Sequence, residues 1–237
     1  MVTALILSGG TGTRLGANIP KQYIEVNNQP IISYCFETLA VSRYIDAIWI
    51  VADERWQEYI EQKVKSYDIY DRFRGFSRPG ANRQLSIFNG LSDIRNGLDK
   101  LGVTPTERGS VLVHDAARPL LSEELIARCV EGAKEHDGAM PVLPMKDTVY
   151  LSNDGVSVSE LLDRSRLFAG QAPELFDIEK YYAANVKLLP DKILSINGST
   201  EPAVMAGMDI AMVSGDENNF KITTMADLER FKQKTNI

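Results

Sequence analysis

The chain has 237 residues, of which 44% are hydrophobic and 24% are charged, values close to those of ordinary globular domains. This composition excludes a disordered, collagen-like or coiled-coil chain, and the length suffices to bury a full α/β core. Acidic residues outnumber basic ones by 32 to 26, which gives a net charge of −6 without any dense Lys/Arg block. We therefore expect no nucleic-acid partner and no binding to an anionic membrane surface.

Signals for export and for disulfide formation are missing from the sequence. The apolar runs are far shorter than the ~20 residues that a membrane span requires, and no basic segment with a cleavage site opens the chain. Cys35 and Cys129 are the only cysteines, which excludes a disulfide scaffold and a cysteine-based zinc site. These features predict a cytoplasmic protein that crosses no membrane.

Short β-branched runs alternate with amphipathic stretches along most of the chain. The runs predicted as buried strands are Val2–Leu7, Ala47–Val51, Val111–Val113 and Ala139–Leu143. Apolar residues at helical spacing predict helices over Ser86–Leu98 and Glu123–His136, and a capping box predicts that the last helix opens at Thr224. Strands separated by helices indicate right-handed crossovers, so we predict an α/β fold with a mostly parallel sheet in one domain, 1–237.

One segment, residues 148–159, breaks this alternation. It holds two alternating strand-like pieces around Asn153-Asp154-Gly155, which predicts a protruding β-hairpin with a tight turn. A lone two-stranded hairpin is marginal in water, so it must pack on its own domain or on a partner subunit. The sequence leaves a dimerisation arm, a lid and an inert flap open.

A glycine-rich loop, SGGTGTRLG, follows the first strand. Glycines at such a turn let backbone N–H groups approach phosphate oxygens. The dinucleotide fingerprint fails because Leu15 stands where its third glycine belongs, and no Walker A sequence follows. Arg14 and Lys21 are fixed cations near the loop and would suit nucleotidyl transfer. An ordinary turn with solvated cations is the alternative.

The second marker is His114-Asp115-Ala-Ala-Arg118, directly after a predicted strand. Ligands of α/β proteins bind at the carboxyl ends of parallel strands, and a carboxylate there can hold Mg²⁺ on nucleotide phosphates. Asp115 is the candidate metal ligand, with capping of the next helix as the alternative role. We interpret His114 as a hydrogen-bonded structural residue rather than a general base.

Seven segments in order resemble the CTP-dependent cytidylyltransferases that act on polyol phosphates. They are LSGGTGTRLG (7–16), PKQY (20–23), GANRQLSIFNGL (80–91), VHDAARP (113–119), KDTV (146–149), LDRSRLF (162–168) and GDENNFKITTMADL (215–228). The resemblance implies a Rossmann-like three-layer α/β/α fold, Mg²⁺ as cofactor, CTP and a polyol phosphate as substrates, and a homodimer formed through the hairpin arm. The nucleophile is then a substrate phosphate, which needs no general base.

The resemblance also implies roles for individual residues. Arg14, Lys21, Arg164 and Lys221 would be catalytic, and Asp115 would hold the metal. The residues implied in nucleotide binding are Ser8, Gly9, Gly10, Thr11, Gly12, Gly80, Arg83 and Ser86. Those implied in substrate binding are Arg118, Arg164, Thr200 and Lys221.

Two departures from the family pattern bear on the acceptor. The family commonly reads Gln-Thr-Pro-Gln where this chain has Gln171-Ala172-Pro173-Glu174, and Ala172 cannot donate the hydrogen bond of a threonine. Thr200 is followed by Glu201 and Pro202, which should reshape that wall. We expect 2-C-methyl-D-erythritol 4-phosphate as acceptor, for isoprenoid synthesis. Ribitol 5-phosphate, or another polyol or sugar phosphate, for wall or capsule polymers, is the alternative.

Three other classes of protein remain open on the sequence. A nucleotidyltransferase that uses another nucleotide on a sugar 1-phosphate shares the glycine loop, although the RQLSIFNGL and HDAARP segments argue against it. A catalytically silent nucleotide-binding protein is conceivable because of Ala172 and Glu174. A nicotinamide oxidoreductase fits least, because of the misplaced third glycine.

Overall fold

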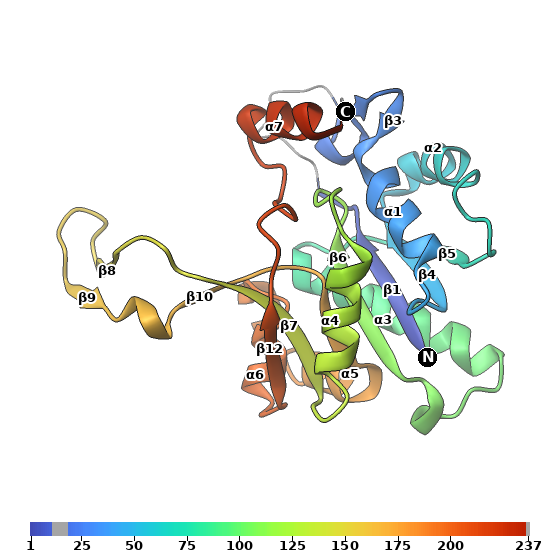
Figure 1. Ribbon diagram of the computed structural model, residues 1–237. Coiled ribbons are helices and arrows are strands. Elements are labelled where there is room, and N and C mark those ends of the chain that lie inside the picture. Colours follow the sequence, from blue (N-terminus) through green and yellow to red (C-terminus); the bar gives the residue numbers. More distant parts are fainter. Residues whose placement is uncertain (11–18, 236–237) are drawn as a thin grey trace.

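A central sheet organises the computed structural model, which describes residues 1–10 and 19–235 (Figure 1). Its strands are β1 (Val2–Leu7), β4 (Ala47–Val51), β5 (Phe73–Ser77), β6 (Ser110–Asp115), β7 (Gly138–Pro144), β10 (Phe168–Gly170), β11 (Glu174–Asp177) and β12 (Ile210–Ser214). They form one eight-stranded sheet in the order β10-β7-β11-β6-β1-β4-β5, with β12 beside β7. The pairs β1–β4, β1–β6, β4–β5 and β7–β12 are parallel, whereas β10 and β11 run antiparallel to their neighbours. The predicted α/β fold with a largely parallel sheet is confirmed.

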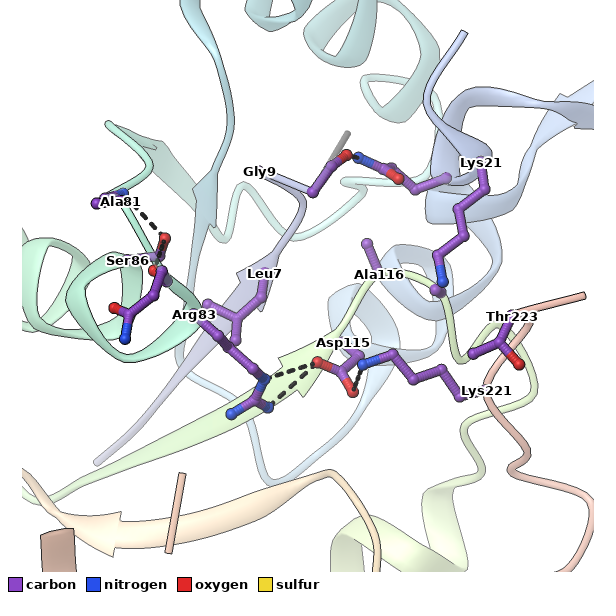
Figure 2. A pocket seen from close by; sticks show the side chains of 15 residues that line it. Leu7, Gly9, Lys21, Ala81, Arg83, Ser86, Asp115, Ala116, Lys221 and Thr223 are labelled. Atoms are coloured by element: carbon purple, nitrogen blue, oxygen red, sulfur yellow. Dashed lines mark hydrogen bonds and ion pairs between the residues drawn. The ribbon is translucent and has the colours of Figure 1, made fainter. Parts of the chain in front are cut away.

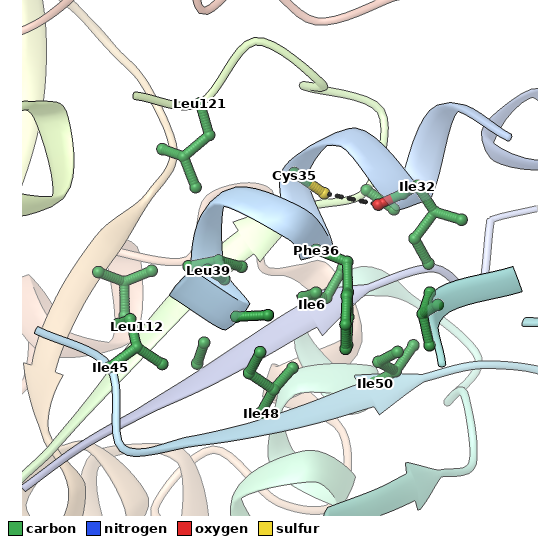
Figure 3. Close-up of a cluster of buried hydrophobic side chains, with 14 of the residues drawn as sticks. Ile6, Ile32, Cys35, Phe36, Leu39, Ile45, Ile48, Ile50, Leu112 and Leu121 are labelled. Atoms are coloured by element: carbon green, nitrogen blue, oxygen red, sulfur yellow. Dashed lines mark hydrogen bonds between the residues drawn. The ribbon is translucent and has the colours of Figure 1, made fainter. Parts of the chain in front are cut away.

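Helices cover both faces of this sheet. The longer ones are α1 (Ile31–Val41), α2 (Glu54–Val64), α3 (Arg83–Lys100), α4 (Glu123–Gly132) and α5 (Ile178–Val186), and α6 (Glu201–Met205) is short. Side chains of β1 alternate between the faces. Ala4 and Ile6 belong to the cluster packed with α1, α2 and α4, of which Figure 3 shows Ile6 beside α1. Leu5 packs on the other face with α3 and α5. This arrangement gives the three layers that the resemblance implied.

The helix ends differ slightly from the sequence prediction. Helix α3 begins at Arg83 rather than Ser86, because the Asn82 side chain caps it by accepting from the Leu85 N–H at 2.8 Å. Helix α4 ends at Gly132, and the chain then turns to enter β7 at Gly138.

The last helix, α7 (Met225–Thr235), starts where the sequence predicted. Its Thr224 hydroxyl accepts from the Asp227 N–H at 3.2 Å, and the Asp227 carboxylate accepts from the Thr224 N–H at 2.8 Å. Through Leu228 and Phe231, α7 packs against the small ribbon of β2 (Glu25–Val26) and β3 (Gln29–Pro30). The chain after Asp115 and the chain before α7 are thereby brought to the same end of the sheet (Figure 1).

A two-stranded arm projects from the sheet (Figure 1). It consists of β8 (Val149–Leu151) and β9 (Glu160–Leu162), which pair antiparallel. The predicted hairpin is present, but its second strand begins only at Glu160, because residues 152–159 form a loop. The Asp154 carboxylate closes this loop by accepting from the backbone N–H groups of Val156 and Ser157 at 2.9 and 2.8 Å. The hairpin therefore extends to residue 162.

The described residues contain neither a membrane-spanning helix nor a reactive thiol. In the described part of the chain, no helix has both the length and the apolar character needed to cross a bilayer. Cys35 and Cys129 are free thiols buried in the core. Burial raises the pKa of each to about 12, so neither is a reactive thiolate at neutral pH.

Candidate active site

A cavity of about 640 Å³ opens at the carboxyl ends of β1 and β6 (Figure 2). The predicted site residues that line it are Gly9, Gly10, Lys21, Gly80, Arg83, Ser86, Asp115 and Lys221. They come from the turn after β1, the start of α3, the end of β6 and the segment before α7. The fold thus gathers at one point residues that are far apart in the sequence, where α/β sheets bind ligands.

Asp115 is the electrostatic centre of the cavity. One carboxylate oxygen, Oδ1, lies 3.1 Å from an Arg83 nitrogen, and Oδ2 lies 3.0 Å from Lys221 Nζ and 3.5 Å from Arg118 Nε. Burial alone would raise the pKa of Asp115, but these three cations hold it well below its usual range. Asp115 is the only carboxylate in the described lining. The cations outnumber it, so the cavity favours an anionic ligand.

The glycine turn after β1 is fixed by the PKQY segment. Gln22 Nε2 donates to the carbonyls of Ser8 at 2.7 Å and Gly10 at 2.8 Å, and the Tyr23 hydroxyl bonds Ser8. A Cβ at Gly9 would lie 2.6 Å from Pro79 Cβ, so only glycine fits there. The sequence prediction gave Gln22 no role, although a polar residue next to Lys21 was a signal for one.

Three of the predicted residues, Thr11, Gly12 and Arg14, lie outside the described residues. Lys21 is described, and its Nζ donates to the Ile222 carbonyl at 2.7 Å. This bond joins the PKQY segment (20–23) to the segment that carries Lys221. In Figure 2 both lysines lie on the same side of the cavity, with Arg83 on the other side of Asp115.

Hydrogen bonds also fix the loop before α3. The Ser86 hydroxyl donates to the Asn82 carbonyl at 2.8 Å and accepts from the Gly80 N–H at 2.9 Å. A Cβ at Gly80 would lie 2.6 Å from Leu85 side-chain atoms. Through its two hydrogen bonds, Ser86 fixes the shape of the cavity rim at Gly80 and Asn82. Asn82, which also lines the cavity, is a residue that the site prediction missed.

Arg118 and His114 lie behind the cavity. Arg118 contacts Asp115 and donates to the Asn219 carbonyl at 2.7 Å, but it does not line the cavity. His114 is fully buried, and its Nε2 donates to the Arg118 carbonyl at 2.9 Å. Burial lowers the pKa of His114 to about 4, which keeps the ring neutral. This agrees with a structural role and leaves no general base at this position.

Like Arg118, two further predicted substrate contacts lie apart from the lining. The Thr200 hydroxyl donates to Oε1 of Glu174 at 3.1 Å, and this bond connects Thr200 to the site. The Glu174 carboxylate lies 3.7 Å from Arg83, and the prediction had treated Glu174 only as a departure from the family. Arg164 lies at the base of the arm, where it donates to the Lys146 carbonyl at 2.7 Å, and the structure does not bring it to the cavity.

A cationic cavity bounded by a glycine turn, at the end of a largely parallel sheet, defines a site for a phosphorylated ligand. The sequence model of the family described as 2-C-methyl-D-erythritol 4-phosphate cytidylyltransferase matches residues 2–233. The chain belongs to this family. The prediction of a CTP-dependent cytidylyltransferase is confirmed at that level.

Individual relatives carry two different names. A ribitol-5-phosphate cytidylyltransferase of Vibrio parahaemolyticus is 33% identical, over 98% of this chain and 94% of its own. A 2-C-methyl-D-erythritol 4-phosphate cytidylyltransferase of Clostridium beijerinckii is also 33% identical, over 96% and 95%. The crystal structure of 4-diphosphocytidyl-2C-methyl-D-erythritol synthase from Anaerococcus prevotii superposes with a TM-score of 0.82 at 24% identity, covering 100% of this chain and 96% of that one. That likeness supports the fold.

Proposed function

We propose that this protein transfers CMP from CTP to a polyol phosphate and releases pyrophosphate. The observation that carries the proposal is the group of cations around Asp115, on the floor of a cavity whose rim is a glycine turn. Gly9 and Gly10, with Thr11 and Gly12 beyond them, would cradle the triphosphate, and the loop at Gly80 with Arg83 and Ser86 would border the nucleoside.

The reaction needs alignment and charge stabilisation more than acid–base chemistry. A phosphate oxygen of the acceptor attacks the α-phosphorus of CTP and forms the new P–O bond. The bond from that phosphorus to the oxygen bridging the α- and β-phosphates breaks, and the electron pair leaves with pyrophosphate. Lys21 and Lys221, with Arg14, would neutralise the charge on the transferring group. The buried, neutral His114 has no part in this scheme.

Mg²⁺ is the proposed cofactor. The described residues contain no group of three or more His, Cys, Asp or Glu side chains that could hold a metal. A single carboxylate, Asp115, nevertheless fits Mg²⁺, which is usually bound through one or two carboxylates together with substrate phosphates and water. When bound, Mg²⁺ would neutralise phosphate charge. Lys221 Nζ lies 3.0 Å from Oδ2 of Asp115. With Mg²⁺ on that carboxylate, Lys221 would be released to contact an acceptor phosphate.

We propose 2-C-methyl-D-erythritol 4-phosphate as the first acceptor to test, because the matching family carries this name. Ribitol 5-phosphate is the second, because a relative with that name is equally similar and because Ala172 offers no hydroxyl. Pyrophosphate release with CTP, Mg²⁺ and each acceptor tests the proposal. Turnover with either compound supports it, and the ratio of kcat/KM values assigns the acceptor. Absence of turnover with both, or equal turnover with ATP or UTP, would contradict it.

We further propose that the chain 1–237 acts as a single nucleotidyltransferase domain in a cytoplasmic homodimer joined through the arm. The arm exposes Tyr150 and Leu161, which are 57% and 63% accessible, and apolar residues on a projecting hairpin favour contact with a second copy. Because Arg164 lies at the base of the arm and away from its own cavity, it would serve the cavity of the partner. Free, buried thiols suit a reducing compartment.

A further inference from the structure

Glu174 is a carboxylate beside the cavity that the proposed reaction does not use. It begins β11 opposite Val113 of β6, so its side chain emerges on the same face of the sheet as that of Asp115, two residues further along. Its side chain is only 11% exposed and lies behind Arg83, outside the lining of the cavity. Burying a carboxylate costs free energy unless it is paired and hydrogen-bonded. The contacts of Glu174 therefore indicate its role.

Every polar partner of Glu174 among residues 1–10 and 19–235 is a donor. The Ser199 and Thr200 hydroxyls bond its carboxylate, the latter at 3.1 Å, and the Arg83 guanidinium lies 3.7 Å away. Burial raises the pKa of Glu174, and Arg83 and the two hydroxyls oppose this shift by favouring the ionised form. An ionised carboxylate only accepts hydrogen bonds. Both hydroxyl protons therefore point at Glu174. Met140 Sδ lies 3.2 Å from the Thr200 oxygen, but a thioether is a much weaker acceptor than a carboxylate.

The turn that carries Thr200 is held in place from a second direction. The Tyr181 hydroxyl donates to the Ser199 carbonyl at 2.6 Å and accepts from Gln84 Nε2 of α3 at 3.0 Å. Thr200 precedes α6 but makes no capping hydrogen bond to that helix, the usual role of a threonine there. Its hydroxyl is instead directed to Glu174. Because a hydroxyl has one proton, the Thr200 oxygen retains only lone pairs for a further partner.

We propose that Glu174, which contacts both Thr200 and the cavity-lining Arg83, is a positioning residue that sets acceptor specificity by holding Thr200 as a hydrogen-bond acceptor. The inference rests on the proposed function. Held in this way, the Thr200 oxygen accepts a hydrogen bond from a hydroxyl of the acceptor's carbon chain, and Thr200 cannot donate to a phosphate oxygen. The acceptor is therefore a phosphate ester whose chain carries a free hydroxyl within reach of Thr200, and its phosphate is left to the cations around Asp115.

The test compares Glu174→Gln with the wild type on ribitol 5-phosphate, 2-C-methyl-D-erythritol 4-phosphate and their monodeoxy analogues. An amide at this position presents N–H donors to the hydroxyls, so the Thr200 proton can turn away. We expect kcat/KM for the hydroxylated acceptor to fall ~10-fold while the KM for CTP changes less than about twofold. The preference over one monodeoxy analogue should shrink by the same factor. Glu135→Gln, an exposed carboxylate-to-amide change, is the matched control and should leave both values unchanged.

Thr200→Val supplies a second, independent variant. It removes the lone pairs, so it should reproduce the loss, and the double variant should be no worse than either single change. Equal losses towards CTP and the acceptor, an unchanged preference over every deoxy analogue, or additive losses would overturn the inference while the proposed function stands. If the wild type transfers CMP to no polyol phosphate, the proposed function falls and the inference falls with it.

Discussion

Replacement of Asp115 by asparagine removes one negative charge and almost no volume from the floor of the cavity. In the wild type the carboxylate lies 3.0–3.5 Å from nitrogens of Lys221, Arg83 and Arg118, and its side chain is 10% exposed. At an effective dielectric constant of ~20, each such pair is worth on the order of 5 kcal/mol before the cost of desolvation. Removing one partner of a buried ion pair leaves the others uncompensated and typically costs about 3–5 kcal/mol. We expect the free energy of unfolding of Asp115→Asn to fall by about that amount.

Urea denaturation at pH 7 measures this change, with Asp191→Asn, an exposed substitution of the same kind, as the control. Calorimetric titration with CTP separates the structural role of the carboxylate from its proposed role as a metal ligand. In EDTA the variant should bind CTP at least as tightly as the wild type, because the cations have lost their internal partner. Mg²⁺ should tighten CTP binding to the wild type and not to the variant. Unfolding free energies within about 1 kcal/mol of each other, or an equal effect of Mg²⁺ on both proteins, would refute this reasoning.

Three further predictions concern other parts of the site. Lys21→Ala should lower turnover ~10²-fold in the pyrophosphate assay, as loss of a charge-stabilising donor commonly does, and unchanged turnover would remove Lys21 from the mechanism. Because the pKa of His114 is about 4 in the folded protein and ~6.5 when unfolded, its burial destabilises the protein progressively as pH falls from about 6.5 to 4. At pH 5 this burial lowers the free energy of unfolding of the wild type by about 2 kcal/mol, and His114→Gln should lack this loss. Plots of unfolding free energy against pH that run parallel for the two proteins would contradict the prediction. Mixing inactive Arg164→Ala and Asp115→Asn chains should restore part of the activity if the arm of one chain completes the site of another, and light scattering that finds only monomers would count against the arm.

The sequence predicted the parts of the fold that depend on local patterns. Buried strands such as Val2–Leu7 and the capping box at Thr224 appear where their patterns place them. The antiparallel strand β11 (Glu174–Asp177) was not predicted, because four residues, three of them buried, leave no clear periodicity. The Asn153-Asp154-Gly155 signal was misleading, because hydrogen bonds to the Asp154 carboxylate stabilise a wider loop than a two-residue turn.

Only the part of the candidate site that lies at the end of a recognisable strand could be predicted from the sequence pattern. Asp115 follows a recognisable strand, so its place at the sheet edge follows from the topology. The contacts of Asp115 with Arg83 and Lys221 join three distant segments. That these residues belong to one site was predicted from the family resemblance and not from their spacing in the sequence. Glu174 is the clearest example of a site residue whose contacts the sequence alone does not predict. Its contacts with Arg83 and Thr200 depend on the register between β11 and β6, which a single sequence does not reveal.

The most direct test of the account is a crystal structure of the protein with CTP and Mg²⁺. We expect the triphosphate to lie against the turn at Gly9 and Gly10, its α-phosphate to lie between Lys21 and Lys221, and the metal to bind Asp115. A nucleotide bound elsewhere, with Asp115 still closed by Arg83 and Lys221, would contradict it.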